Sequence, residues 1–231
     1  MKLVGERRAL AAVVFALYAL FYFVLAISQA QPDLTPALYA LCGVYGLAFF
    51  SLVAGYFWAR WYAVGVGLYG VIVGAIGIWQ IGAEPIIVFI GGTHLLAAAM
   101  LWGDSMSASY DGQLKWRERF HMDDNAVHRL GRSVIRAGVS LPIVLLYALA
   151  PKSGAALAVG LPALLLVVVG LRGLTQVKTW GVLALGAAGG LLLAFAGFQH
   201  GAGVMLPTLS GALLASAALP FAAPMLRYVR A

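Results

Sequence analysis

Eight long apolar runs follow one another along the chain, and short polar or turn-rich segments separate them. The runs lie at about 9–30, 37–58, 62–81, 86–103, 133–150, 155–172, 180–198 and 204–226. The segments between them are rich in glycine, proline and polar residues, a composition typical of turns. About 20 apolar residues in a row span a bilayer as a helix. The pattern therefore predicts an all-α, polytopic membrane protein with eight transmembrane helices.

The overall composition supports membrane insertion. Hydrophobic residues make up 63% of the 231 residues, charged residues only 10%, and the mean hydropathy is +0.94. A soluble domain carries about 25% charged residues, so this composition excludes a water-soluble fold. Cys42 is the only cysteine and lies in an apolar run. An intrachain disulfide and a cysteine metal cluster are therefore excluded.

The N-terminus has two interpretations. The basic segment MKLVGERR precedes an apolar run, and Ser28-Gln29-Ala30 resembles the cleavage site of a signal peptide. The run 9–30 is 22 residues long, however, and this length fits a full membrane span better than the shorter apolar region of a signal peptide. We interpret it as an uncleaved first helix.

The basic residues predict the orientation of the eight spans. If the N-terminus is cytoplasmic, fourteen of the fifteen Lys and Arg residues fall on the cytoplasmic side, and only Lys152 falls on the other. This bias agrees with the positive-inside rule. It places both termini in the cytoplasm, and the Ala-, Gly- and Leu-rich usage favours a bacterial inner membrane. Contact with anionic lipid then accounts for the net charge of +7, so nucleic acid is not expected as a partner.

The two halves of the chain resemble one another. At an offset of 119 residues, eleven of 39 positions are identical, among them the pairs Trp61 with Trp180 and Gln80 with Gln199. Four spans per half give both halves the same orientation, so we predict a parallel 4+4 internal repeat. The predicted parts are a first four-helix half (1–103), a cytoplasmic loop with an interfacial helix (104–132) and a second four-helix half (133–231).

Glycines spaced four residues apart occur in both halves, as Gly70 with Gly74 and as Gly186 with Gly190. Small residues at this spacing allow two helix backbones to approach closely in lipid. We therefore predict that these pairs serve helix packing.

Thr93 and His94 form the first candidate site, in the middle of the run FIGGTHLLAAAML. His94 has about eight helical residues on each side, or about 12 Å of membrane. An ionisable group at this depth is a candidate for proton transfer, ligand binding or haem ligation. The alternative is a neutral histidine that is hydrogen-bonded to a neighbouring helix. His200 lies about 10 Å away in depth, so bis-histidine haem ligation is not expected, and no cofactor is predicted.

Gln80, Gln199 and His200 form the second candidate site. The two glutamines occupy equivalent positions in the repeat, near the external ends of their helices, and Glu84 follows soon after Gln80. One interpretation is a polar vestibule between the halves that binds a ligand or a proton. The other is hydrogen bonding of helix ends at the headgroup level.

The cytoplasmic loop contains a third cluster. His121, Asp124 and His128 fall on one helical face, but the two histidines are about 10.5 Å apart along a straight helix, too far to share one ion. We therefore predict no metal site. Asp123 or Asp124 more simply caps the helix that follows, and Trp116 is expected to insert into the membrane interface.

Motifs of common enzymes are missing from the sequence, which contains no phosphate-binding glycine loop, no HExxH and no paired intramembrane carboxylates. We therefore predict a non-catalytic membrane subunit or binding module. Its partners would be membrane lipids, a hydrophobic or lipid-like ligand, a partner chain or further copies of itself. The alternative is a channel or transporter for a small solute or lipid, with His94 in its pathway. An enzyme acting on a membrane substrate would need the loop to fold over a pocket.

Overall fold

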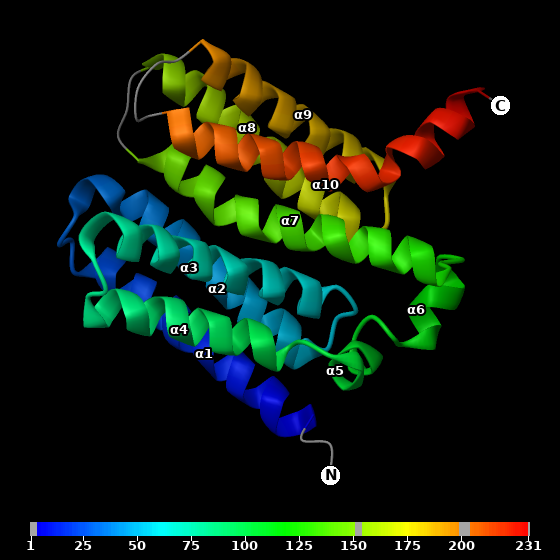
Figure 1. The fold of residues 1–231 in the computed structure, drawn as a ribbon, viewed down its shortest axis with the longest axis horizontal. Helices are drawn as coiled ribbons and strands as arrows, with labels where there is room; N and C mark the ends of the chain where they lie inside the picture. Colours follow the sequence, from blue (N-terminus) through cyan, green and yellow to red (C-terminus); the bar gives the residue numbers. More distant parts are fainter. Residues whose placement is uncertain (1–3, 151–153, 199–203, 231) are drawn as a thin grey trace. The chain divides into compact units, whose positions relative to one another are not determined.

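The computed structural model describes residues 4–150, 154–198 and 204–230, with side chains described up to Ala222. Within these ranges the chain forms ten α-helices and one short 3₁₀ helix, η1 (Pro32–Leu34), so the fold is all-α as predicted (Figure 1). The chain divides into two compact units, Met1–Arg119 and Phe120–Ala231. The division falls inside the segment 104–132 that was predicted to be a separate loop.

The first unit contains four long helices and two short ones. The long helices are α1 (Val4–Ile27), α2 (Thr35–Ala54), α3 (Ala59–Ile81) and α4 (Pro85–Met100). They pack in a closed cycle, because α1 contacts α2 and α4, and α3 contacts the same two helices. The short helices α5 (Asp104–Ser109) and α6 (Leu114–Arg119) follow α4 (Figure 1).

The second unit repeats this order of neighbours. It consists of α7 (Asp124–Leu149), α8 (Gly154–Thr175), α9 (Thr179–Gly197) and α10 (Met205–Arg230). Here α7 contacts α8 and α10, and α9 contacts the same two helices. Each unit is therefore a four-helix bundle in which consecutive helices pack together and the last helix returns to the first.

Seven of the described helices have the length and apolar composition of membrane spans. Large apolar side chains on their surfaces are exposed, such as Leu17, Phe50 and Leu165 at 60–67%, as expected of helices that face lipid. The chain is therefore a polytopic helical membrane protein. The predicted span 86–103 corresponds to α4, which is only 16 residues long. It ends early because Leu101 and Trp102 close its last turn and Gly103 follows with φ +104°.

Glycines bring α3 and α4 close together. A Cβ atom added to Gly74 would lie 2.7 Å from the Cα of Gly91, so any larger residue would separate the two helices. The predicted packing role of Gly70 and Gly74 is therefore confirmed. In the second unit the prediction is wrong for Gly190, around which there is open space. Gly189 has this role instead, because its Cβ would lie 2.6 Å from the backbone nitrogen of Ala215.

Arginines at one end of the first unit bind the last carbonyls of its helices. Arg7 donates a hydrogen bond to the carbonyl of Trp102, just after α4, and Arg8 donates to the carbonyl of Val53 at the end of α2. The C-terminal carbonyls of a helix lack helical donors, and positive charge is favourable there. Two residues of α1 thereby stabilise the ends of two neighbouring helices.

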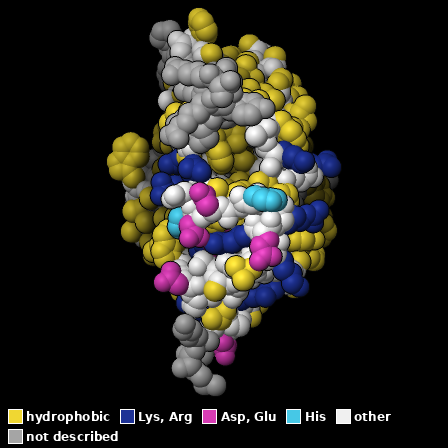
Figure 2. Space-filling model, turned by 90° about the vertical axis from the view of Figure 1, so that its right-hand side faces the viewer, with side chains coloured by type: hydrophobic (Ala, Val, Ile, Leu, Met, Phe, Trp, Pro, Cys, Tyr) yellow, Lys and Arg dark blue, Asp and Glu magenta, His cyan; other side chains and the backbone are white. Residues whose placement is uncertain are grey.

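The segment after α4 is bound to helices α2 and α3 of the first unit. Asp111 receives two hydrogen bonds of 2.7 Å from Arg60, and the hydroxyl of Tyr110 donates to the carbonyl of Leu52 at 3.1 Å. Burial raises the pKa of Tyr110, so this hydroxyl keeps its proton. Trp116 is buried against Phe57, with stacked rings 4.3 Å apart. The prediction that Trp116 inserts into the membrane interface is wrong. Charged side chains gather on the face that includes this segment (Figure 2).

Candidate functional site

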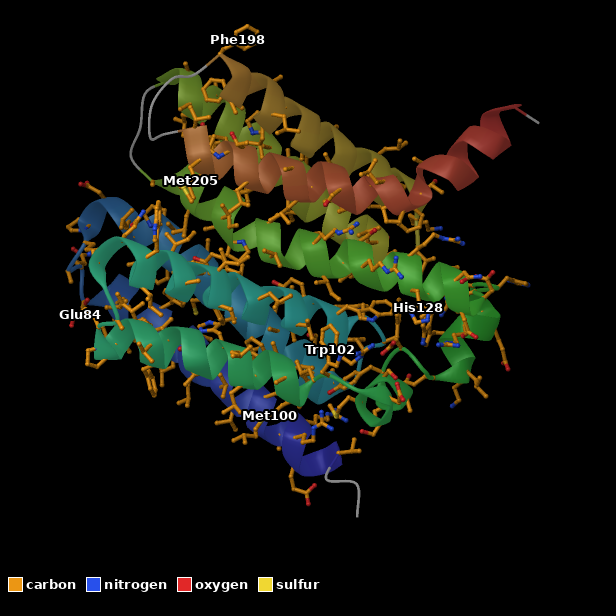
Figure 3. All side chains as sticks on the ribbon, in the orientation of Figure 1. Glu84, Met100, Trp102, His128, Phe198 and Met205 are labelled. Atoms are coloured by element: carbon orange, nitrogen blue, oxygen red, sulfur yellow. The ribbon has the colours of Figure 1, made fainter. Side chains whose placement is uncertain are left out.

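Helix α4 places His94 in the interior of the first unit. The helix begins with Pro85, whose fixed φ suits the first helical position, after Glu84 in an extended conformation. His94 is only 1% exposed. Figure 3 labels Glu84 and Trp102, which mark the two ends of α4, and His94 lies between them. A polar side chain buried in this way needs hydrogen-bond partners.

Both ring nitrogens of His94 have such partners. Nδ1 lies 2.8 Å from the carbonyl oxygen of Ile90, one turn back in α4, and Nε2 lies 2.7 Å from the hydroxyl of Tyr45 in α2. A carbonyl oxygen only accepts hydrogen bonds, so Nδ1 carries a hydrogen and donates. In the neutral ring Nε2 then accepts, and the Tyr45 hydroxyl donates to it. These are the partners that a neutral, structural histidine requires.

A second polar contact joins α1 to α4 beside the histidine. The hydroxyl of Tyr18 lies 2.6 Å from Oγ1 of Thr93, and the Tyr18 ring lies 4.0 Å from the His94 ring, centroid to centroid. Thr93 donates to the carbonyl of Phe89 at 2.8 Å. Its single hydrogen is thus used within its own helix, so Tyr18 is the donor in the contact between the two hydroxyls.

All four long helices of the first unit surround the His94 ring. Besides Tyr18 of α1 and Tyr45 of α2, Gly70 of α3 lies against it so closely that an added Cβ would be 2.0 Å from the ring carbon Cδ2. The Tyr45 ring also contacts the ring of Tyr22, at 5.3 Å. A single imidazole is thereby held in one orientation by contacts from every side of the bundle.

An apolar groove of about 190 Å³ runs between α1 and α4. Its walls include Leu17 and Phe21 of α1 and Phe89 of α4, whose side chains are 46–63% exposed. Tyr18 and Thr93 also line it, and their hydroxyls are bonded to each other. The groove thus offers apolar contact along its length and leads to the residues that touch His94.

The second candidate site is described only in part. Gln80 lies in the last turn of α3, and it is exposed, as is Glu84. Gln199 and His200 lie outside the described residues. The predicted pairing of the two glutamines across the halves stays a prediction.

The loop residues form no metal centre in the part of the chain that the structure describes, where no three His, Cys, Asp or Glu side chains converge. His121 and His128 are exposed. Asp123 is the N-cap of α7 and accepts a hydrogen bond of 2.6 Å from the backbone nitrogen of Ala126. The predicted capping of this helix is confirmed.

Tyr18 and Tyr45 were missed as site residues by the sequence analysis. Each lies in an apolar run without a distinctive motif. The available signal was that tyrosines at mid-depth in two runs need hydrogen-bond partners, as His94 does in a third. Pairing them required knowledge of which helices are neighbours.

The fold and the buried polar cluster define a polytopic α-helical membrane protein with a histidine at the centre of its first bundle. Comparison of the chain with protein families, curated proteins and solved structures found no match.

Proposed function

We propose that the protein is a non-catalytic membrane binding module, or the membrane subunit of an assembly, which takes a hydrophobic, lipid-like ligand in the groove between α1 and α4. The observation that carries the proposal is the groove itself, with about 190 Å³ of space between exposed apolar side chains. An apolar cavity of about 150 Å³ accommodates benzene. The groove therefore has room for a short stretch of hydrocarbon chain.

The chemistry of the lining favours a hydrocarbon tail over a polar headgroup. The hydroxyls of Tyr18 and Thr93 already bond each other, and Thr93 also donates to a backbone carbonyl. A polar ligand group would have to break these bonds, whereas a hydrocarbon chain leaves them intact. The ligand would contact Tyr18, whose ring also lies against the ring of His94.

The proposed architecture has eight spans in two parallel halves, with both termini in the cytoplasm of a bacterium. The same cyclic order of neighbours in both units supports the repeat. Two glycines at equivalent positions, 119 residues apart, also support the repeat. Gly70 lies in close contact with α4, and Gly189 lies in close contact with α10. As a span, α4 would be about 24 Å long, which a slightly thinned bilayer accommodates at modest cost.

Filling the groove tests the proposal. Leu17→Trp places a large ring in the groove. Leu20→Trp is the matched control, because Leu20 is also exposed on α1 but does not line the groove. Native mass spectrometry of gently solubilised protein should show a retained lipid or other hydrophobic molecule in the wild type and in Leu20→Trp, and at least several-fold less in Leu17→Trp. Equal retention in all three would overturn the proposal. A co-purifying chain would identify the protein as a subunit.

A transporter or channel for a small solute or lipid is the second candidate, and the burial of His94 among all four helices favours it. Intramembrane histidines can relay protons or bind a solute. The test is solute and proton flux in proteoliposomes that contain either the wild type or His94→Leu. Loss of flux in the variant would support this function, and unchanged flux for every solute tested would exclude a role of His94 in transport.

A further inference from the structure

The net positive charge of the protein comes entirely from its C-terminal part. From Asn125 to the C-terminus the sequence has eight Lys and Arg residues and no Asp or Glu, whereas residues 1–124 have seven basic and eight acidic residues. The basic side chains after Asp124 therefore have no carboxylate in their own segment to neutralise them. Their counter-charges must come from outside it, and anionic phospholipid is the natural source at a membrane surface.

The second unit also has an apolar groove, which lies between α9 and α10 and measures about 350 Å³. Small residues make room for it: Gly186 and Ala187 of α9, and Ala215 and Ala218 of α10. Val182 and Leu219 add apolar walls. The groove is lined by the first turns of α9, so it begins close to the segment that joins α8 to α9.

The first half differs at the positions that open this groove. On the proposed repeat, Ala187 corresponds to Leu68 and Ala215 corresponds to Leu96. The α9–α10 groove therefore depends on small residues that are particular to the second half. Simple duplication of a packing pattern does not explain it.

Basic and aromatic residues lie at the end of the groove where α9 begins. Lys178 is the N-cap of α9, one turn before Val182, and Arg172 is in the last turn of α8. Both are exposed, and Trp180 is 39% exposed beside them. Lysine and arginine at this level attract lipid phosphates, and tryptophan is typical of the headgroup region.

We propose that this groove holds one acyl chain of an anionic phospholipid and that Lys178 and Arg172 bind the phosphate of the same lipid. The chain would lie along the small residues of α9 and α10. On the proposed orientation the lipid belongs to the cytoplasmic leaflet. This site lies in the second unit, and it stands or falls independently of the α1–α4 groove.

The test is lipid binding to the full-length, detergent-solubilised protein, measured by native mass spectrometry with phosphatidylglycerol and phosphatidylcholine of identical acyl chains. The double variant Arg172→Gln/Lys178→Gln should weaken binding of phosphatidylglycerol by roughly 25-fold, at about fivefold per basic residue. Its binding of phosphatidylcholine should stay unchanged. The control Arg129→Gln/Arg132→Gln removes the same charge from α7 and should change either affinity less than threefold.

A second pair of variants tests the groove. Ala187→Leu should weaken binding of both lipids, because it fills the space of the acyl chain, whereas Ala194→Leu, exposed on α9 beyond the groove, should not. The proposal is wrong if the two charge variants behave alike, which would indicate a diffuse charge effect. It is also wrong if Ala187→Leu binds lipid as the wild type does, or if it instead changes the oligomeric state, which would assign the groove to a second copy of the chain.

Discussion

Arg136 of α7 donates a hydrogen bond of 2.6 Å from Nη1 to the backbone carbonyl of Ser216 in α10. In a regular helix this carbonyl would accept from the amide of residue 220, but residue 220 is proline and has no N–H. The guanidinium thus satisfies an acceptor that the proline leaves free. An arginine within an apolar run and a proline within another, which look unfavourable separately, compensate for each other.

This relationship predicts a measurable coupling between the two positions. Arg136→Met should lower the free energy of unfolding by about 1–2 kcal/mol, since it leaves a carbonyl without a donor. In a Pro220→Ala background, where the amide of residue 220 is restored, the same change should cost clearly less. A double-mutant cycle on unfolding in detergent measures the difference. Equal costs in both backgrounds would show that the arginine does not serve this carbonyl.

The hydrogen bond between Tyr45 and His94 predicts that Tyr45→Phe is destabilising. The change removes the hydroxyl and leaves Nε2 of a buried imidazole without its donor, at a cost of about 1–3 kcal/mol. Tyr39→Phe on the same helix is the control, because Tyr39 is 46% exposed. Thermal unfolding followed by circular dichroism should separate the two variants, and similar midpoints would contradict the assigned bond.

The contact of Gly70 with the His94 ring predicts that Gly70→Ala cannot be accommodated without movement. The new methyl group would overlap the ring, and the cost should be on the order of 1–3 kcal/mol. Gly92→Ala on α4 has open space around it and should be neutral or slightly stabilising. Thermal unfolding of both variants checks the prediction, which is wrong if Gly70→Ala melts with the wild type.

The ion pair of Arg60 and Asp111 predicts that the segment with α5 and α6 detaches when the pair is broken. Asp111→Asn should cost about 1.5–3 kcal/mol of local stability, since the pair is largely buried, at 15% and 9% exposure. Cleavage by trypsin after Lys115 should then become faster. Asp104→Asn changes an exposed carboxylate in the same segment and should leave the cleavage rate unchanged.

The long apolar helices could be predicted because run length and composition determine them. The end of α4 could not be predicted. The helix ends at Met100, shortly before the positive φ of Gly103, although the apolar run continues to residue 103. His94 could be singled out as an ionisable group in an apolar run. Its partners Tyr18 and Tyr45 could not be assigned, since they lie 76 and 49 residues earlier in the chain and are brought together only by the cyclic order of helices.

The environment of Trp116 could not be predicted for the same reason. Its sequence neighbours Lys115 and Arg117 made it typical of an interfacial helix. The ring of Phe57 gives it a stacked partner, and only the folded unit brings the two rings together. The local sequence indicates that the side chain of this tryptophan lies in an apolar environment. It does not indicate whether lipid or protein provides that environment.

The two arginines near the start of α1 bind carbonyls that lie far away in the sequence. The carbonyls that Arg7 and Arg8 bind, those of Trp102 and Val53, follow 95 and 45 residues later in the chain, so each bond can form only after α4 or α2 has been synthesised. Until then the two guanidinium groups lack these partners, and on the proposed orientation they are available to anionic lipid at the cytoplasmic surface. Once α2 and α4 have been made, the same groups join the ends of three helices. The same two side chains thus connect the first helix of the bundle to helices that are completed later in synthesis.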